Sequence, residues 1–181
     1  VAVPRDNEIK IDAAEQMFAG LFSLRKGGFF HFLKRQHVIS FEIVALKEKI
    51  GFYVSCSKDI QDLVEKQIHG AYPSAEIKEV DEINIFNENG RVEFAALKLD
   101  EADFYPVKTY QDLPTDGLSL ITSAMSKMQE GEGGALQILL QPAGKRWKKR
   151  GRKYMQKEKK READPDQASY KHDPKEMEAI S

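Results

Sequence analysis

The sequence predicts an α+β fold in which helices pack on a mostly antiparallel sheet. In the first half of the chain, periodic segments follow the order strand, helix, hairpin, helix, strand, which is the order of a ferredoxin-like split βαβ unit. The second half follows as strand, strand, helix, strand, helix, an incomplete echo of the first. Apolar residues make up 41% of the 181 residues and charged residues 31%, which is typical of a folded globular protein.

The first predicted strand and helix lie at the N-terminus. Val1–Val3 is predicted to end a strand, which Pro4 closes. Asp12 forms an N-cap pair with Glu15 and begins a helix whose apolar stripe continues to Leu24.

An aromatic stretch, Phe29–Leu33, follows the glycines that end this helix and lies between basic residues. The simpler interpretation is a loop or short helix that packs against the core. The alternative is a wedge that faces a membrane or a protein partner, because aromatic side chains beside basic ones suit an interface.

A hairpin and a second helix are predicted next. Residues 38–46 and 50–57 alternate apolar and polar side chains and are joined by a short charged link, as in a β-hairpin. Asp59–Tyr72 has the periodicity of an amphipathic helix, for which Ser57 is a suitable N-cap. Ala75–Ile85 is predicted to be extended.

The second half begins with a strong turn signal at residues 87–90, which read Asn-Glu-Asn-Gly. Strands are predicted on both sides of residue 100, at 92–97 and at 104–109. Apolar residues at helical spacing then predict a helix over 118–128. A glycine-rich turn separates that helix from a short apolar strand at 135–140, which Pro142 ends.

Three regions follow from this order of elements. Residues 1–86 form a ferredoxin-like α+β half, residues 87–163 form a second α+β half that ends in a basic helix, and residues 164–181 form a linker or mobile tail. The tail has few large apolar side chains with which to build a core. Because the first residue is Val1 rather than Met, we expect the chain to be a domain cut from a longer protein.

The strongest electrostatic feature is the segment Lys145–Arg161, which has eleven Lys or Arg residues and one acid, Glu158. The segment carries +10 whereas the whole chain carries −1, so the remaining residues carry −11. Such a patch attracts polyanions, which include nucleic acid, acidic lipid and acidic protein surfaces. A solvated helix face with no partner is the simpler interpretation.

One side of this basic helix is predicted to pack against the protein, because Trp147, Gly151, Tyr154 and Met155 fall near one face. The other side supplies candidate residues for contacts with nucleic acid or a protein partner. These candidates are Lys145, Arg146, Lys148, Lys149, Arg150, Arg152 and Lys153.

Signatures of catalysis are missing from the sequence. No GxxxxGK[ST] loop is present, and the glycines at 131–134 do not fit GxGxxG. The four histidines are dispersed, and Cys56 lies in an apolar strand, where a buried and inert thiol is expected. Glu130 and Glu132 are too few to define a cation site. We therefore predict no catalytic residue, cofactor, metal or small-molecule substrate, and no enzyme activity.

The sequence also predicts a location in the cell. A single cysteine excludes an intrachain disulfide and suggests a reducing compartment. No apolar run approaches the roughly 20 residues that cross a bilayer. We expect the cytoplasm, with peripheral contact at the inner face of the membrane as an alternative.

Four stretches resemble one family. They are AAEQMFAGL (13–21), SFEIVALKEKIGFYVSC (40–56), LVEKQIHGAYPSAEI (63–77) and MQEGEGGALQILLQPAGKRWKKRGR (128–152). Together they are similar to the region N-terminal to the motor in conjugative DNA-transfer ATPases of type IV secretion systems, particularly those of small-genome bacteria. The ATP site of that family lies in a later domain, so the resemblance implies a non-catalytic accessory or assembly domain that docks the motor to its partners. Those partners would be the downstream motor domain or proteins of the secretion complex.

Three hypotheses of different classes remain open at this point. The first is the docking domain of a DNA-translocating ATPase. The second is a sequence-nonspecific nucleic-acid-binding module that uses the basic helix at 145–161 to contact phosphates. The third is an enzyme whose site the sequence does not reveal.

Overall fold

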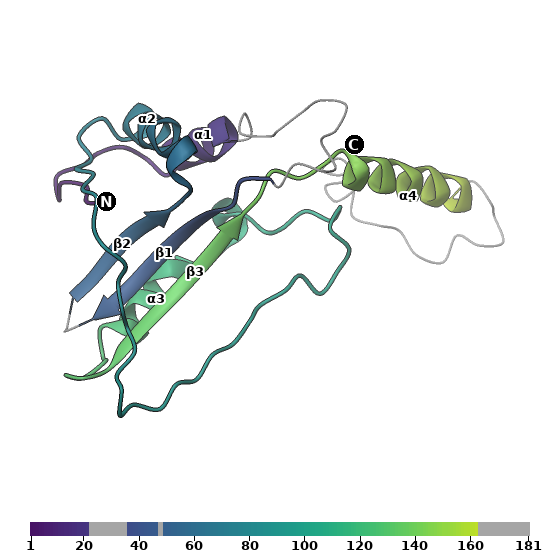
Figure 1. Cartoon of the computed structure of the whole chain (residues 1–181). Coiled ribbons are helices and arrows are strands. Elements are labelled where there is room, and N and C mark those ends of the chain that lie inside the picture. Colours follow the sequence, from purple (N-terminus) through teal and green to yellow (C-terminus); the bar gives the residue numbers. More distant parts are fainter. Residues whose placement is uncertain (22–35, 47–48, 163–181) are drawn as a thin grey trace. The chain divides into compact units, whose positions relative to one another are not determined.

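The computed structural model describes residues 1–21, 36–46 and 49–162 (Figure 1). Within those residues the chain forms four α-helices and a three-stranded antiparallel sheet, so the predicted α+β class is confirmed. The predicted aromatic stretch at 29–33 and the predicted tail at 164–181 lie outside the described residues. The end of the first predicted helix, beyond Leu21, also lies outside them.

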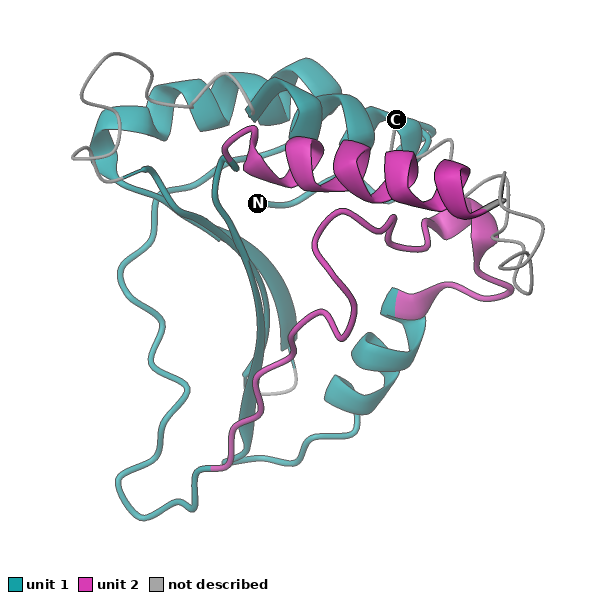
Figure 2. Ribbon diagram, turned by 90° about the vertical axis from the view of Figure 1, so that its right-hand side faces the viewer, with its two compact units in different colours: residues 1–92, 118–143 teal, residues 93–117, 144–181 magenta. Residues whose placement is uncertain are grey.

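The chain divides into two compact units, each built from separate parts of the sequence (Figure 2). Unit 1 contains residues 1–92 and 118–143, and unit 2 contains residues 93–117 and 144–181. The sequence predicts two contiguous halves, 1–86 and 87–163. That these halves are the folding units of the chain stays a prediction.

The sheet of unit 1 has the strand order β2-β1-β3. Its strands are β1 (Ile39–Leu46), β2 (Lys49–Ser55) and β3 (Gly133–Leu140), and both neighbouring pairs are antiparallel. β1 is therefore central, with Ile43 opposite Phe52 on one side and Leu136 on the other. The predicted hairpin at 38–57 and the predicted strand at 135–140 are confirmed, although the side chains of β3 are half-buried or exposed rather than buried.

Two core clusters lie along the same face of β1, because every second residue of a strand points to the same side. At one end, α1 (Asp12–Leu21) and α2 (Gln61–Ala71) pack against this face. At the other end, α3 (Gly117–Met125) supplies Met125. The first cluster has Met17, Leu21, Ile39, Ile60, Val64, Ile68 and Ala75 as its buried residues, and the second has Ile43, Ala45 and Met125.

The other face of the sheet is partly covered as well. Val44 is buried on it, with 4% of its surface exposed. Figures 1 and 2 show that residues 77–92 run along this side of the sheet, whereas α3 lies on the opposite side. The approach is close at the start of β3, where a Cβ atom on Gly133 would lie 2.9 Å from the carbonyl oxygen of Ile85.

The N-terminal part of unit 1 is compatible with the ferredoxin-like order. An isolated antiparallel bridge joins Ala2 to Glu76, and the amino group of Val1 donates a hydrogen bond of 2.8 Å to the carbonyl of Phe52 in β2. The chain thus follows the order short extended segment, α1, β1–β2 hairpin, α2, short extended segment. β3 is added beside β1, on the edge away from these two segments.

The turn between α3 and β3 is built as its glycines predict. Gly131 has a φ of +88°, in the left-handed region that favours glycine. The carboxylate of Glu132 accepts a hydrogen bond of 2.9 Å from the backbone amide of Gln129, which closes the turn. The helix is shorter than predicted, because it ends at Met125 rather than at residue 128.

Two predicted strands, at 92–97 and 104–109, are wrong. The turn at residues 87–90 forms, with the amide of Gly90 bonded to the carbonyl of Asn87 at 2.9 Å, but it joins no paired strands. Phe94 and Leu97 are each 92% exposed. β propensity largely reflects packing against a neighbouring strand, and in the described chain these segments have no strand beside them.

The close approach at Gly133 gives a testable prediction. Gly133→Ala should lower the free energy of unfolding by roughly 1–3 kcal/mol, because the new methyl group meets backbone that has to move. Gly70→Ala is the matched control, since nothing lies within 4 Å of its added Cβ and Ala suits a helix better than Gly by about 0.5–1 kcal/mol. Urea unfolding measures both changes. Equal stability of Gly133→Ala and wild type would show that residues 77–92 do not press on β3.

Candidate nucleic-acid interface

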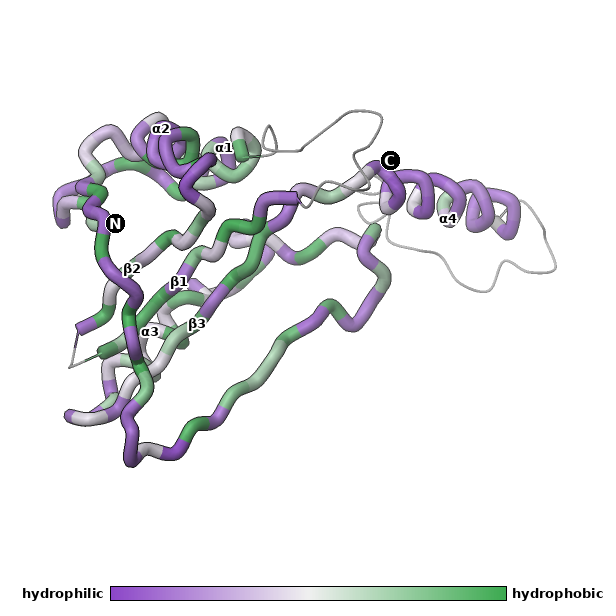
Figure 3. Tube along the Cα trace, viewed as in Figure 1, coloured by the Kyte–Doolittle hydropathy of each residue, from purple (hydrophilic) through white to green (hydrophobic). Residues whose placement is uncertain are grey.

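The basic segment forms α4 (Arg146–Glu162), a helix of 17 residues in unit 2. Most of the helix is hydrophilic (Figure 3), yet one face is covered. The covered positions recur at steps of four, three, one and three residues, which places them on one side of a helix. They are Trp147, Gly151, Tyr154, Met155 and Glu158. The predicted packing face is therefore confirmed, with the addition of Glu158.

Within unit 2, α4 packs on residues 103–105. The rings of Phe104 and Tyr105 lie 5.3 Å and 5.6 Å from the ring of Tyr154, and 5.0 Å from each other. Arg150 forms an ion pair with Asp103 beside these rings. Aromatic pairs at such distances are worth about 0.5–1.5 kcal/mol beyond the burial of their area. This three-ring cluster fixes which side of α4 faces the protein.

The opposite side of α4 is exposed and carries basic side chains. We call it the basic face and define it by Lys145, Arg146, Lys148, Lys149, Arg152, Lys153, Lys159 and Lys160, all of which are exposed. Four of these, Lys145, Lys148, Lys149 and Arg152, line a surface concavity. The ammonium group of Lys148 also lies 5.3 Å from the centre of the Trp147 ring.

Glu158, the one acidic residue within 145–161, lies on the covered side of α4 rather than on the basic face. Glu158 is 7% exposed, and its carboxylate accepts a hydrogen bond of 3.1 Å from the guanidinium of Arg161. The carboxylate therefore belongs to the covered side of α4 and is not part of the basic face. The arrangement concentrates positive charge on one side of the helix, which is the electrostatic requirement for binding a polyanion.

Six of the seven predicted contact residues lie on the basic face, and Arg150 does not. Its guanidinium is engaged by Asp103, 47 residues earlier, a partner that no local pattern identifies. The sequence prediction missed Lys159 and Lys160 because it stopped at Lys153. Their spacing of seven residues from Arg152 and Lys153 is the signal that could have included them.

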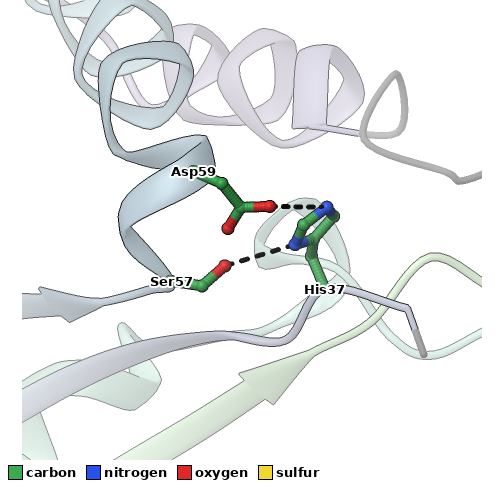
Figure 4. A network of polar contacts seen from close by, with 3 residues as sticks. All are labelled: His37, Ser57 and Asp59. Carbon is green, nitrogen blue, oxygen red and sulfur yellow. Dashed lines mark hydrogen bonds and ion pairs between the residues drawn. The ribbon is translucent and has the colours of Figure 1, made fainter.

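A second polar arrangement lies in unit 1 (Figure 4). Nδ1 of His37 lies 3.2 Å from the hydroxyl of Ser57, and Nε2 of His37 lies 3.6 Å from a carboxylate oxygen of Asp59. The sequence prediction missed it, since His37 is 20 residues from Ser57. Ser57 does precede the first helical turn, but its side chain makes no capping hydrogen bond there and contacts His37 instead.

These three residue types also occur in nucleophilic catalytic triads, but the geometry here is that of a structural tie. The distance of 3.6 Å exceeds the 2.7–3.2 Å of a good N–H···O hydrogen bond, and the Asp59 side chain is 62% exposed. The His37 side chain, by contrast, is only 10% exposed. The contacts join the residues before β1 to the start of the turn that leads into α2.

The free cysteine, Cys56, is half-buried next to this tie. Burial raises the pKa of its thiol, and the negative charges of Glu65 and Asp59 raise it further. A raised pKa lowers the fraction of reactive thiolate at neutral pH, in agreement with the inert thiol that the sequence predicts.

Comparison with known proteins gives a family for the chain. Residues 1–176 match the family described as a domain of unknown function (DUF8128), and the chain belongs to that family. A search of curated proteins and a search of solved structures found no match. Across the ranges 1–21, 36–46 and 49–162, no helix is long and apolar enough to cross a bilayer.

The environment of Cys56 predicts its reactivity. The rate of alkylation by iodoacetamide should rise with pH around a midpoint above that of a free cysteine peptide, because the thiolate is disfavoured by burial and by two nearby carboxylates. Glu65→Gln should move the midpoint toward lower pH, and Glu15→Gln, on α1, serves as the control. A wild-type midpoint at or below that of the peptide would contradict the described surroundings.

Proposed function

We propose that this domain is a sequence-nonspecific nucleic-acid-binding module that contacts the phosphate backbone through the basic face of α4. The observation that carries the proposal is the division of α4 into two sides. One side is held by the three-ring cluster, while the basic side chains of the other are exposed together. A helix that is anchored in this way presents its basic side chains from a fixed backbone.

The chemistry of the basic face favours phosphates over base edges. Seven of its eight residues are distributed along α4, and Lys and Arg side chains are the usual donors to phosphate oxygens. Such contacts fix the position of a protein on nucleic acid but do not read its sequence. Each phosphate that is neutralised releases counterions, so the affinity should fall steeply with salt.

The proposal is non-catalytic and needs no cofactor. We place the proposed binding of nucleic acid in the cytoplasm, with attachment at the inner face of the membrane as an alternative. Support for the cytoplasm comes from the single free thiol, which a reducing compartment would keep reduced.

A second candidate function is the docking of a DNA-transfer motor. The observation that favours it is the exposure of apolar side chains in unit 2, above all Phe94 and Leu97, which are 92% exposed. Large exposed apolar patches are typical of protein–protein contact sites, and Phe94 and Leu97 lie three residues apart. The four stretches that resemble type IV secretion ATPases also coincide with α1, the β1–β2 hairpin, α2 and the β3–α4 segment. In this role the domain would assist a motor without hydrolysing ATP itself.

Reversal of charge on the basic face tests the first proposal. A variant with Arg146, Lys149, Arg152 and Lys153 changed to Glu should keep the circular dichroism of the wild type, because these side chains are exposed. Its affinity for labelled DNA at low salt should fall at least 100-fold. The wild type should show a log–log salt slope of several units, at about −0.9 per duplex phosphate contacted.

The matched control changes the same net charge elsewhere. Lys10, Lys58, Lys66 and Lys78 are exposed residues of unit 1, and their change to Glu should reduce the affinity far less. Equal losses in both variants would mean that net charge, rather than α4, governs binding. Absence of wild-type binding at low salt would eliminate the proposal.

The docking function makes a different prediction. Phe94→Ser with Leu97→Ser should abolish binding to the motor domain of a type IV secretion ATPase from the same genome, measured by isothermal titration calorimetry, and should leave DNA binding intact. The stability of the domain should change little, because both side chains are exposed. Leu120→Ser, at an exposed residue of α3, is the control. Undiminished motor binding by the double variant would remove this surface from the docking function.

A further inference from the structure

Six of the eight residues of the basic face form two parallel rows along α4. Lys148, Arg152 and Lys159 form the first row, and Lys149, Lys153 and Lys160 form the second. Both rows have the spacing of four and seven residues, and they are offset by one position. Because successive residues of a helix are rotated by about 100°, the rows lie about 100° apart around the axis.

The strip between the two rows carries less charge. Within the helix it is occupied by Gln156, which is exposed, and Lys145 precedes it just before the helix begins. Each row extends over eleven residue steps, which is about 17 Å at 1.5 Å per residue. The helix thus presents two lines of positive charge with a neutral amide between them.

We infer that α4 binds double-stranded DNA in the B form by lying in its major groove, an inference that rests on the proposed nucleic-acid-binding function. A helix with its side chains is about 10–12 Å across, and the major groove is about 12 Å wide. A phosphate backbone borders each side of that groove. The first row then faces one backbone and the second row faces the other, while Gln156 lies toward the base edges.

Single-stranded DNA is not expected to contact both rows of basic residues at once. It has one backbone and can neutralise only one row at a time. Proteins that bind single strands without sequence preference add aromatic side chains on which bases stack. None of the residues of the basic face is aromatic. Tyr154 packs on Phe104 and Tyr105, and the half-buried Trp147 ring lies 5.3 Å from the ammonium group of Lys148.

Double-stranded RNA is excluded by the shape of its groove. In the A form the major groove is deep and narrow, so that a helix with long side chains does not enter it. The two rows therefore distinguish B-form DNA from duplex RNA by geometry alone, although both carry the same type of phosphate.

The test compares three ligands of one sequence with the full chain. Fluorescence anisotropy at fixed salt should show at least tenfold tighter binding of a 30-base-pair DNA duplex than of its single strand or of the duplex RNA. Lys148→Gln with Arg152→Gln removes two charges from the first row, and Lys149→Gln with Lys153→Gln removes two from the second. Each pair should weaken duplex binding to a similar extent and reduce the salt slope by about 2 units. Phe94→Ala, which removes the most exposed aromatic ring among the described residues of unit 2, should leave all three affinities unchanged.

The outcomes separate this inference from the proposal on which it rests. Equal or tighter binding of the single strand or of duplex RNA would overturn the major-groove inference and leave nucleic-acid binding in place. Loss of binding from one row variant alone would overturn it too, because a helix in the groove needs both rows. A loss of single-strand binding in Phe94→Ala would identify base stacking instead. If the chain binds none of the three ligands, the proposed function itself is overturned.

Discussion

The antiparallel pairing of β1 on both of its edges is the constraint on which unit 1 depends. Alternation along β1 places Ile39 and Phe41 under α1 and α2, and Ile43 and Ala45 under α3, so a single strand supplies the floor of both cores. The partner on one edge, β2, is adjacent in sequence. The other partner, β3, begins at Gly133, so this register is fixed by contacts between residues about 90 positions apart. A one-residue slip there would exchange the two faces of β3.

In unit 2 the organising contact is the ring cluster beneath α4. A helix with ten Lys and Arg residues, from Arg146 to Arg161, gains little from its own sequence, since like charges three and four residues apart repel one another. Packing of Tyr154 on Phe104 and Tyr105 compensates for that repulsion and fixes the helix in one orientation. Because the backbone of α4 is already helical, the proposed binding of a polyanion would cost less conformational entropy than it would for a disordered basic tail.

The sequence correctly predicted those helices and strands in which the local residue pattern agrees with the tertiary contacts. The β1–β2 hairpin, α2 and α4 were predicted because alternation or helical spacing there coincides with a face that is buried. Prediction failed at 92–97, where apolar alternation has no strand beside it, and Phe94 remains exposed. It also missed the contacts of His37 with Ser57 and of Arg150 with Asp103, because a single sequence does not say which distant polar groups will meet. Six of the seven predicted contact residues nevertheless share the basic face, since helical periodicity alone determines that grouping.

The charge distribution of the whole chain explains why a strongly basic helix occurs in a protein with a net charge of only −1. The residues outside 145–161 carry −11, so in the proposed function they would repel the same polyanion that α4 attracts. In that function the attraction would come from α4, so the charge arrangement would favour encounters through this helix more than it would strengthen the complex. A uniformly basic protein of this size would bind in many orientations and would release slowly. Opposed charges would favour binding through α4 with an affinity that responds to salt, as the proposed contact with nucleic acid without sequence readout requires.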